Sequence, residues 1–214
     1  MTGIVHVIDD DEGVCDSLKA LLELKGYAVL AHTGTIDFLE KFKPDTALCI
    51  LADLRMPGIG GLELQERMAV IGVDVPFVMI TGHGDVPSAV RALKSGAIDF
   101  IEKPLEASLV LSAVERASAT RRKTVKEAQH KAEARQRLGQ LTPRESQVLH
   151  LLIQGKSNKI IAFELCISQR TVENHRARLM MKTKAESVAE LITLASAAGF
   201  ANRETLDLHQ GIAE

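Results

Sequence analysis

The first hundred residues alternate between short apolar runs and longer amphipathic segments. The apolar runs are Ile4–Ile8, Ala28–Ala31, Ala47–Ala52, Phe77–Ile80 and Ile98–Ile101. Runs of this length suit buried strands and are short for helices. Five strands that alternate with helices predict an α/β fold, a doubly wound five-stranded parallel sheet with right-handed crossovers.

Helical spacing relates the apolar residues between these runs. Val14, Leu18, Leu21 and Leu22 follow the i, i+4, i+7, i+8 pattern of one buried helix face. Similar spacing assigns further apolar residues to three more helices: Leu62, Leu64 and Met68; Val90, Leu93 and Ala97; and Leu109, Val110 and Val114. Phe38 and Phe42 are interpreted as core residues.

Residues 117–140 contain few apolar side chains and are rich in Ala, Glu, Lys and Arg. This composition favours a helix, which could continue the last helix of the first domain. Two roles fit such a segment. It could be a solvated helical spacer, or a helix used for dimerisation or signalling.

The remaining residues carry the signals of four short helices. Thr142, Pro143 and Glu145 predict a capping box with a proline in the first turn. Three more helices are expected: Asn158 to Leu165, capped by Ser157 with Ile160 and Ile161 inside; a helix capped by Ser168 that runs to about Lys182; and Ser187 to Ala198, with Val188, Leu191, Ile192 and Ala195. A compact bundle of this kind can contain a helix-turn-helix.

Charge divides the chain into two halves. The whole chain carries a formal charge of −2. Residues 1–116 hold 10 Lys and Arg against 18 Asp and Glu, a net charge of −8, whereas residues 117–214 hold 16 against 10, a net charge of +6. An acidic half joined to a basic half predicts two domains with different partners, and the basic half suits nucleic acid.

Composition excludes several other classes of protein. Hydrophobic residues make up 46% of the chain and aromatic residues 3%, which predicts an aliphatic core rather than an aromatic-rich β-sandwich. Cys15, Cys49 and Cys166 lack metal-ligand spacing and are expected to be small buried hydrophobes in a reducing compartment. Since no apolar run is long enough for a membrane helix, a cytoplasmic protein is expected.

Ligands of an open parallel sheet bind beyond the carboxyl ends of its strands. Asp9, Asp10 and Asp11 follow the first apolar run, and Asp53 follows the third. Thr81 follows the fourth run and precedes Gly82, and Lys103 follows the fifth and precedes Pro104. Singly, each could be a helix cap, a turn residue or a solvated loop residue. Together they predict one site.

Several carboxylates at one edge repel one another unless a cation compensates. Oxygen ligands suit Mg²⁺, which takes few carboxylates and keeps several waters. Asp53 could then act as a nucleophile that forms an aspartyl-phosphate. Lys103 would neutralise charge on the transferring group, and Thr81 would donate a hydrogen bond to it. His83 is interpreted as a loop residue, and the Arg55 side chain as one that points to solvent or a carboxylate.

This pattern resembles the receiver domain of two-component response regulators, most closely the FixJ subfamily. The matching residues are Asp9-Asp10, Leu54-Arg55-Met56-Pro57-Gly58, the run from Thr81 to Pro87, and the run from Asp99 to Pro104. The resemblance implies that a histidine kinase phosphorylates Asp53. It also implies that Asp10, Asp53 and the Arg55 carbonyl bind Mg²⁺, with Asp9 acting through water.

The same resemblance implies a switch. Thr81 would bond the phosphoryl oxygen, Lys103 would pair with it, and Phe100 occupies the family's aromatic switch position. Turning Thr81 and Phe100 inward would repack the face formed by the fourth helix and fifth strand, which could dimerise or release the output domain. The Lys103–Pro104 peptide bond is expected to be cis.

The third helix of the second half carries a polar face suited to a major groove. Val172 and Leu179 would anchor the helix inward. The exposed candidates for DNA contact are Arg170, Thr171, Glu173, Asn174, Arg178 and Lys182. Asn174 could read adenine, Glu173 could accept a hydrogen bond from cytosine, and Arg170 or Arg178 could read guanine or bind phosphate. An ordinary polar helix face is the alternative.

The second half also resembles the LuxR-type helix-turn-helix of NarL and FixJ regulators. The matching residues are the runs Leu141 to Glu145, Asn158 to Ala162 and Thr171 to Arg176, together with Ile167-Ser168. Where relatives carry lysine in this helix, the chain has Glu173 and Ala177. The predicted domains are a receiver at 1–120, a helical linker at 117–140, the helix-turn-helix domain at 137–202 and a tail at 203–214.

Together the two resemblances imply a transcription regulator rather than an enzyme, with at most autophosphatase activity. Its implied partners are a cognate histidine kinase, double-stranded promoter DNA, RNA polymerase and a second copy of the chain. The fourth helix of the second half, Ser187 to Ala198, is the implied dimer face of that domain. Two alternatives stay open. A phosphohydrolase usually needs a second aspartate where Arg55 stands, and a constitutive DNA-binding module would ignore the phosphoryl group.

Overall fold

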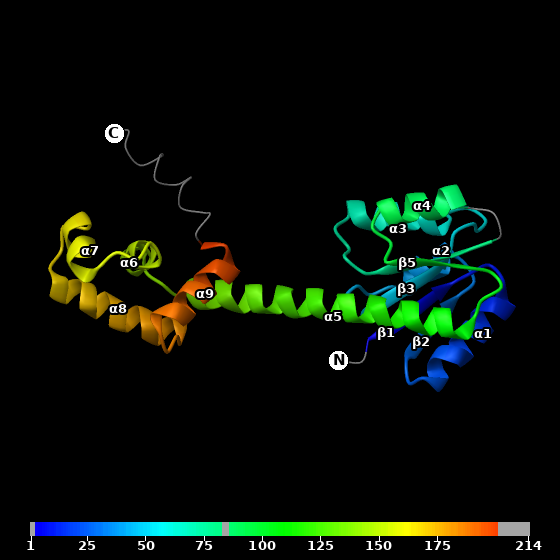
Figure 1. Cartoon of the computed structure of the whole chain (residues 1–214), viewed down its shortest axis with the longest axis horizontal. Coiled ribbons are helices and arrows are strands. Elements are labelled where there is room, and N and C mark those ends of the chain that lie inside the picture. The colour runs from blue at the N-terminus through cyan, green and yellow to red at the C-terminus, as the bar shows by residue number, and fades with distance from the viewer. Residues whose placement is uncertain (1–2, 83–85, 201–214) are drawn as a thin grey trace. The chain divides into compact units, whose positions relative to one another are not determined.

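The computed structural model describes residues 3–82 and 86–200 of the chain (Figure 1). The chain divides into two compact units, Met1–Val125 and Lys126–Glu214. The first unit contains a five-stranded parallel sheet in the order β2-β1-β3-β4-β5. Its strands are β1 (Ile4–Ile8), β2 (Ala28–His32), β3 (Ala47–Asp53), β4 (Phe77–Thr81) and β5 (Asp99–Glu102). The predicted α/β fold with a doubly wound parallel sheet is confirmed.

Helices cover both faces of this sheet. The first part of α5 (Ala107–Leu138) packs with α1 (Glu12–Leu24) on one face. The opposite face is covered by α2 (Thr35–Lys41), α3 (Gly61–Val70) and α4 (Val86–Lys94). Every residue of β3 is buried, and from Cys49 to Ala52 its side chains alternate between the two cores. Burial on both faces explains why the central strands read as continuous apolar runs.

The polar ends of the strands lie at one edge because all five strands are parallel. Four strands end one residue past the predicted apolar runs, on the polar residues His32, Asp53, Thr81 and Glu102. The fifth strand begins at Asp99 rather than at Ile98. Strand pairing depends on backbone hydrogen bonds, so a polar residue can end a strand that hydrophobicity alone would stop earlier.

Three apolar residues predicted on buried helix faces are exposed instead. Val90, Leu93 and Leu109 are 42%, 38% and 54% exposed, whereas Ala92 is fully buried. Ala97 is buried but lies beyond the end of α4. Helical spacing alone does not identify which side of a helix faces the sheet, and on α4 the smaller Ala92 takes the buried place.

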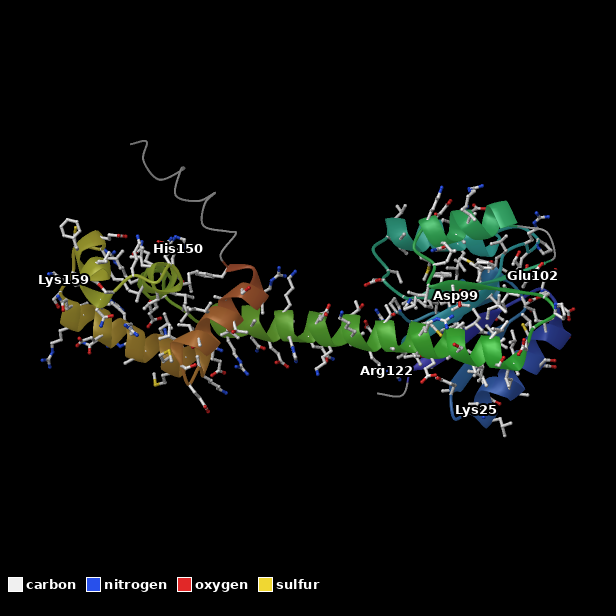
Figure 2. All side chains as sticks on the ribbon, in the orientation of Figure 1. Lys25, Asp99, Glu102, Arg122, His150 and Lys159 are labelled. Atoms are coloured by element: carbon white, nitrogen blue, oxygen red, sulfur yellow. The ribbon has the colours of Figure 1, made fainter. Side chains whose placement is uncertain are left out.

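The helix α5 runs without a break from Ala107 to Leu138, through the segment rich in Lys, Arg, Glu and Ala. Near its middle, the Arg121 guanidinium donates hydrogen bonds to the carbonyls of Pro44, Ala47 and Asp74. Residues 126–133 are exposed, and the side chains of this stretch, beginning near the labelled Arg122, stand out from the helix (Figure 2). Ala134 and Leu138 are buried in the core of the second unit.

The second unit packs the end of α5 with four short helices. They are α6 (Pro143–Ile153), α7 (Asn158–Glu164), α8 (Gln169–Thr183) and α9 (Val188–Ala198). The predicted capping box is present, because Thr142 and Glu145 each accept a hydrogen bond from the other's backbone. Val172 and Leu179 anchor α8 in two small cores.

Several details of the second unit differ from prediction. Ile160 is 47% exposed and Ile192 is 42% exposed, because the buried positions belong to their neighbours Ile161 and Leu191. Ser157 precedes α7 as predicted, but its side chain makes no capping hydrogen bond. Cys166 is exposed, unlike Cys15 and Cys49, because it lies in the turn between α7 and α8.

His83 and the predicted tail at 203–214 lie outside the described residues. Of the helices that the structure describes, none is both long and apolar enough to cross a membrane.

Candidate functional site

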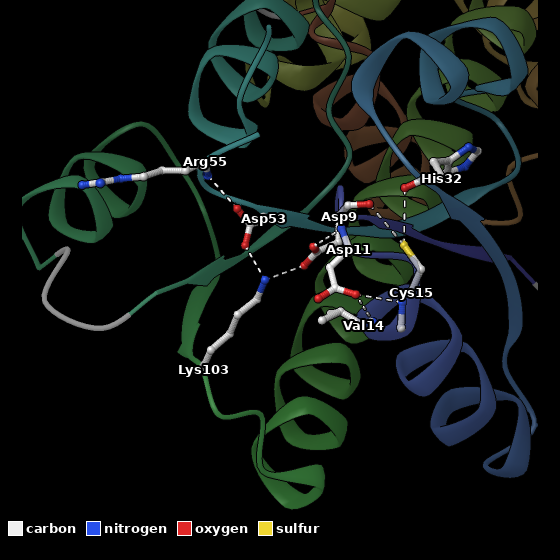
Figure 3. A network of polar contacts seen from close by, with 9 residues as sticks. Asp9, Asp11, Val14, Cys15, His32, Asp53, Arg55 and Lys103 are labelled. Carbon is white, nitrogen blue, oxygen red and sulfur yellow. Dashed lines mark hydrogen bonds and ion pairs between the residues drawn. The ribbon is translucent and has the colours of Figure 1, made fainter. Parts of the chain in front are cut away.

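The carboxyl edge of the sheet gathers two buried carboxylates and one lysine. Asp9 follows β1 directly and is fully buried, and Asp53 is the last residue of β3 and is also buried. Lys103 follows β5 directly. Its Nζ lies 2.8 Å from Oδ2 of Asp9 and 2.8 Å from Oδ1 of Asp53 (Figure 3). One ammonium therefore bridges two carboxylates that the sequence separates by more than forty residues.

The backbone around Lys103 holds its side chain at this edge. The Lys103 amide donates to the Thr81 carbonyl at 2.8 Å, which continues the pairing of β4 and β5 past the last strand residue. The Lys103–Pro104 peptide bond is cis, as predicted.

Asp53 is oriented by the loop that follows it. Its Oδ2 accepts a hydrogen bond of 2.7 Å from the Arg55 amide, while the Arg55 side chain points away from the carboxylate (Figure 3). Gly60 and Gly61 let the loop pass close beneath this strand end. A Cβ built on Gly60 would lie 2.6 Å from the Leu54 carbonyl oxygen, and one built on Gly61 would lie 2.5 Å from that of Asp53. Sequence reasoning missed both glycines, although Gly60 caps α3 and Gly61 is its first residue.

The three acidic residues after β1 occupy different environments. Asp9 accepts the Asp11 amide at 3.0 Å. Asp11 caps α1 by accepting the amides of Gly13 and Val14, which is one of the roles that the sequence left open for it. Asp10 is exposed, and no hydrogen bond or ion pair ties its side chain to another described residue. The sheet edge therefore offers one buried, one exposed and one capping carboxylate.

Burial and charge oppose each other at this site. Burial raises the pKa of the Asp9 carboxyl above its usual value, although the hydrogen bond from Lys103 works against that rise. Burial also disfavours the charged form of Lys103, but its hydrogen bonds to Asp53 and Asp9 outweigh it and raise the pKa of the ammonium. Lys103 therefore stays cationic, and it compensates two acids that would otherwise repel each other.

The donor atoms at this edge determine which metal ion they could hold. Among the described residues, no three His, Cys, Asp or Glu side chains are grouped to hold a metal ion. Mg²⁺ does not need such a group, because one or two carboxylates with a carbonyl and waters satisfy it. Asp10, Asp53 and the Arg55 carbonyl offer only hard oxygen donors, and Asp10 is open to solvent. This donor set fits magnesium in kind.

Thr81 is the last residue of β4, which pairs with β3, and Phe100 lies on β5, which pairs with β4 on its other side. Thr81 is buried, and its hydroxyl donates to the Gly82 carbonyl at 3.2 Å. Phe100 is 39% exposed on β5. Neither side chain bonds to Asp53 here, so the structure brings Asp9, Asp53 and Lys103 together and leaves Thr81 and Phe100 beside them.

The predicted DNA-contact residues separate into two groups on α8. Arg170, Glu173, Asn174 and Arg178 are exposed. Thr171 is half-buried, with its hydroxyl 2.8 Å from that of Ser168. The Lys182 ammonium donates to the buried Glu145 carboxylate at 2.7 Å. Four of the six residues are therefore presented to solvent, and two are engaged within the unit.

Comparisons with known proteins match both units. Residues 5–115 match the response regulator receiver domain, and residues 139–195 match the bacterial regulatory proteins of the luxR family. The chain is 45% identical over 197 residues to the transcriptional regulatory protein FixJ of Azorhizobium caulinodans, which covers 92% of this chain and 93% of that protein. FixJ of Rhizobium meliloti is 45% identical over 197 residues, covering 92% and 96%.

Solved structures agree with these matches. The response regulator StyR is 39% identical, with a TM-score of 0.84 over 92% of this chain and 99% of that chain. Full-length FixJ from B. japonicum is 41% identical, with a TM-score of 0.57 over 94% and 100%.

Proposed function

Because the chain belongs to the two-component response regulators of the FixJ/NarL family, we propose that phosphorylation of Asp53 controls its binding to promoter DNA. Membership in this family makes the chain a phosphorylation-dependent regulator of transcription, with a receiver and a LuxR-type DNA-binding domain. We assign the receiver to residues 1–120, the linker to 117–140 and the DNA-binding domain to 137–202.

The position of Lys103 between Asp9 and Asp53 carries this proposal. A phosphoryl group on Asp53 replaces one carboxylate charge with a more highly charged group beside the same ammonium. Lys103 already lies 2.8 Å from Oδ1 of Asp53, so its charge is in place before the group arrives. Such preorganised charge stabilises a transferring phosphoryl group without reorganisation of the site.

The transfer itself needs few groups. An oxygen of Asp53 attacks the phosphorus of a phosphohistidine on the kinase, so that an O–P bond forms as the N–P bond breaks. The bonding pair returns to the histidine nitrogen. Hydrogen bonds from the Arg55 amide and Lys103 orient the attacking carboxylate. Slow attack by water on the aspartyl-phosphate would return the free carboxylate, as autophosphatase activity.

Asp10, Asp53 and the Arg55 carbonyl would hold Mg²⁺, with Asp9 acting through bound water. When bound, the ion supplies positive charge that stabilises the phosphoryl oxygens. The chemistry of this donor set supports the assignment, because it offers only oxygen ligands.

The switch would involve Thr81 and Phe100. A phosphoryl oxygen on Asp53 gives the Thr81 hydroxyl a stronger acceptor than the Gly82 carbonyl that it now bonds. Movement of Thr81 vacates space on β4 into which Phe100 of β5 can turn. The exposed apolar side chains of Val90, Leu93 and Phe100 support α4 and β5 as the surface that then dimerises.

The output is DNA binding through α8. Arg170, Asn174 and Arg178 are exposed on this helix and suit base edges or phosphates. Thr171, Glu173 and Lys182 complete the proposed contact set. The proposed partners are RNA polymerase at promoters and a histidine kinase that supplies the phosphoryl group. A protein with these partners would work in the cytoplasm.

Apparent mass in solution tests the proposal. The full chain would be measured with Mg²⁺, with and without beryllofluoride as a phosphoryl mimic, as wild type, Asp53→Ala and Asp45→Ala. Asp45 is exposed at the opposite edge of the sheet, just before β3, and serves as the matched control. We expect a mimic-induced dimer in wild type and Asp45→Ala and none in Asp53→Ala.

DNA binding by the same proteins separates the alternatives. Tighter binding with beryllofluoride in wild type and Asp45→Ala, but not in Asp53→Ala, would connect the pocket to the output. Equal affinity of wild type and Asp53→Ala under both conditions would instead indicate a constitutive DNA-binding module. Steady turnover of phosphomonoesters would indicate a phosphohydrolase.

A further inference from the structure

Glu173 places a carboxylate on the exposed face of α8. It is exposed, as are Arg170, Asn174, Ala177 and Arg178 on the same helix. Within residues 3–82 and 86–200, no hydrogen bond or ion pair joins the Glu173 side chain to another residue. Its negative charge is therefore free to act on whatever approaches this helix.

Some of the basic residues of α8 are engaged with other helices and are not available beside Glu173. Arg176 donates to Asn158 on α7, and Lys182 donates to the buried Glu145 on α6. These two cations hold α8 against its neighbours. Arg170 and Arg178 are left on the exposed face. Glu173 is therefore one acidic side chain beside two available arginines, on a surface proposed to bind DNA.

A carboxylate near DNA is unfavourable unless a hydrogen-bond donor meets it. In the major groove, guanine presents two acceptors, thymine an acceptor and a methyl group, and adenine a donor beside an acceptor. Cytosine alone offers a donor, its N4 amino group, without an acceptor on the same edge. The only base edge that satisfies a carboxylate without also repelling it is therefore that of cytosine.

We infer that Glu173 is a specificity-determining residue, which admits cytosine at one position of the DNA site and rejects the other bases there. The inference rests on the proposed entry of α8 into the major groove. Glu173 gains discrimination at the cost of general affinity, because its charge repels phosphates wherever the cytosine donor is missing. Arg170 and Arg178 supply the attraction that every sequence shares.

Site selection with the full chain tests this role. Wild type, activated with Mg²⁺ and beryllofluoride, would first select sites from a pool of randomised duplex DNA. Affinities would then be measured for the selected site, for its three substitutions at each position, and for an unrelated duplex. The variants would be Glu173→Ala and Glu173→Gln, with Arg178→Ala as the control from the same exposed face. Thermal unfolding would show that each variant is folded, since both side chains are exposed.

We expect wild type to prefer cytosine at one position by roughly five- to 150-fold. Glu173→Ala should lose that preference, keep the others, and bind unrelated DNA about fivefold more tightly, with an unchanged salt dependence. Glu173→Gln should accept adenine as well, because its amide can donate and accept. Arg178→Ala should weaken binding to all sequences and lower the salt slope by about one.

Two results would overturn the inference, and they can be told apart. If Glu173→Ala keeps every base preference of wild type, the inference is wrong while the proposed function stands. If activated wild type selects no sequence from the pool, the proposed function fails, and the inference fails with it.

Discussion

Nδ1 of His6 lies 3.0 Å from Nε2 of His32, so two imidazoles on neighbouring parallel strands share a hydrogen bond inside the sheet. Nδ1 of His32 lies 2.8 Å from Oδ2 of Asp37. A carboxylate can only accept, so His32 donates from Nδ1 and accepts at Nε2, and His6 must donate from its own Nδ1. Nε2 of His6 is then unprotonated, and this buried atom has no hydrogen-bond partner in the described structure.

The first prediction concerns acid stability. Burial, with the nearby His32, lowers the pKa of His6 to about 4, and burial also lowers the pKa of His32 despite its bond to Asp37. Below about pH 6.5 these two histidines therefore bind protons in the unfolded chain but stay unprotonated in the folded chain. Stability should be complete above this pH and fall as the pH decreases toward 4. We expect His6 to account for a loss of roughly 2–3 kcal/mol between about pH 7 and about pH 4.5, measured by urea unfolding.

A variant isolates His6 from the carboxylates that titrate over the same range. His6→Leu suits a buried strand and removes the titrating group, so its unfolding free energy should depend on pH less steeply, by about one proton near pH 5. Parallel pH profiles of wild type and His6→Leu would show that His6 does not contribute.

The second prediction concerns thiol reactivity. Burial raises the pKa of the Cys49 thiol to about 12 and also raises that of Cys15, whereas Cys166 is exposed in the turn before α8. A thiol reagent should modify one cysteine rapidly in the native chain and the other two only on unfolding. Peptide mass mapping should place the rapid modification on Cys166. Cys166→Ser should abolish the rapid phase, and a remaining fast phase would contradict the assignment.

Much of the fold was predictable because its signals are local or periodic. Burial on both faces makes the central strands continuous apolar runs, and Thr142 and Glu145 lie within one helical turn of each other. The candidate site residues followed from topology. Parallel strands end at one edge, so Asp9, Asp53 and Lys103 could be grouped without knowing any distance.

Other features depend on contacts that no local pattern encodes. His6 and His32 meet through the pairing of β1 with β2, across 26 residues of sequence. The helical spacing on α4 pointed to Val90 as a buried position, whereas packing against the sheet buries Ala92. Lys182, proposed as a DNA contact from its place on α8, also bonds to Glu145, 37 residues away, which its position on the helix does not reveal.

The third prediction tests that contact between α6 and α8. Glu145 accepts from the Thr142 amide at 2.9 Å and from Lys182 at 2.7 Å, and it is almost fully buried. Glu145→Ala removes both bonds and should destabilise the second unit by about 2–3 kcal/mol. Glu145→Gln keeps the cap but loses the charge and should cost about half as much. Hydrogen exchange of α6 and α8 amides would measure both losses.

Glu186→Gln is the control for this series, because Glu186 is exposed between α8 and α9. It should leave exchange in α6 and α8 unchanged. Equal protection in Glu145→Ala and Glu186→Gln would mean that the contact between Glu145 and Lys182 contributes nothing to the stability of the unit.

The last prediction returns to the ammonium of Lys103. Lys103→Met keeps much of the side-chain length but leaves Asp9 and Asp53 without the cation that lies 2.8 Å from each. At neutral pH the variant should lose about 1–3 kcal/mol of unfolding free energy. Added Mg²⁺ should stabilise the variant more than wild type, because an ion that binds only the folded chain gains affinity when a competing positive charge is removed. Lys43→Met, at an exposed position before β3, should match wild type in both stability and response to Mg²⁺. An identical response of all three proteins to Mg²⁺ would place the magnesium site away from Lys103 and contradict the assignment of Asp53 as a ligand.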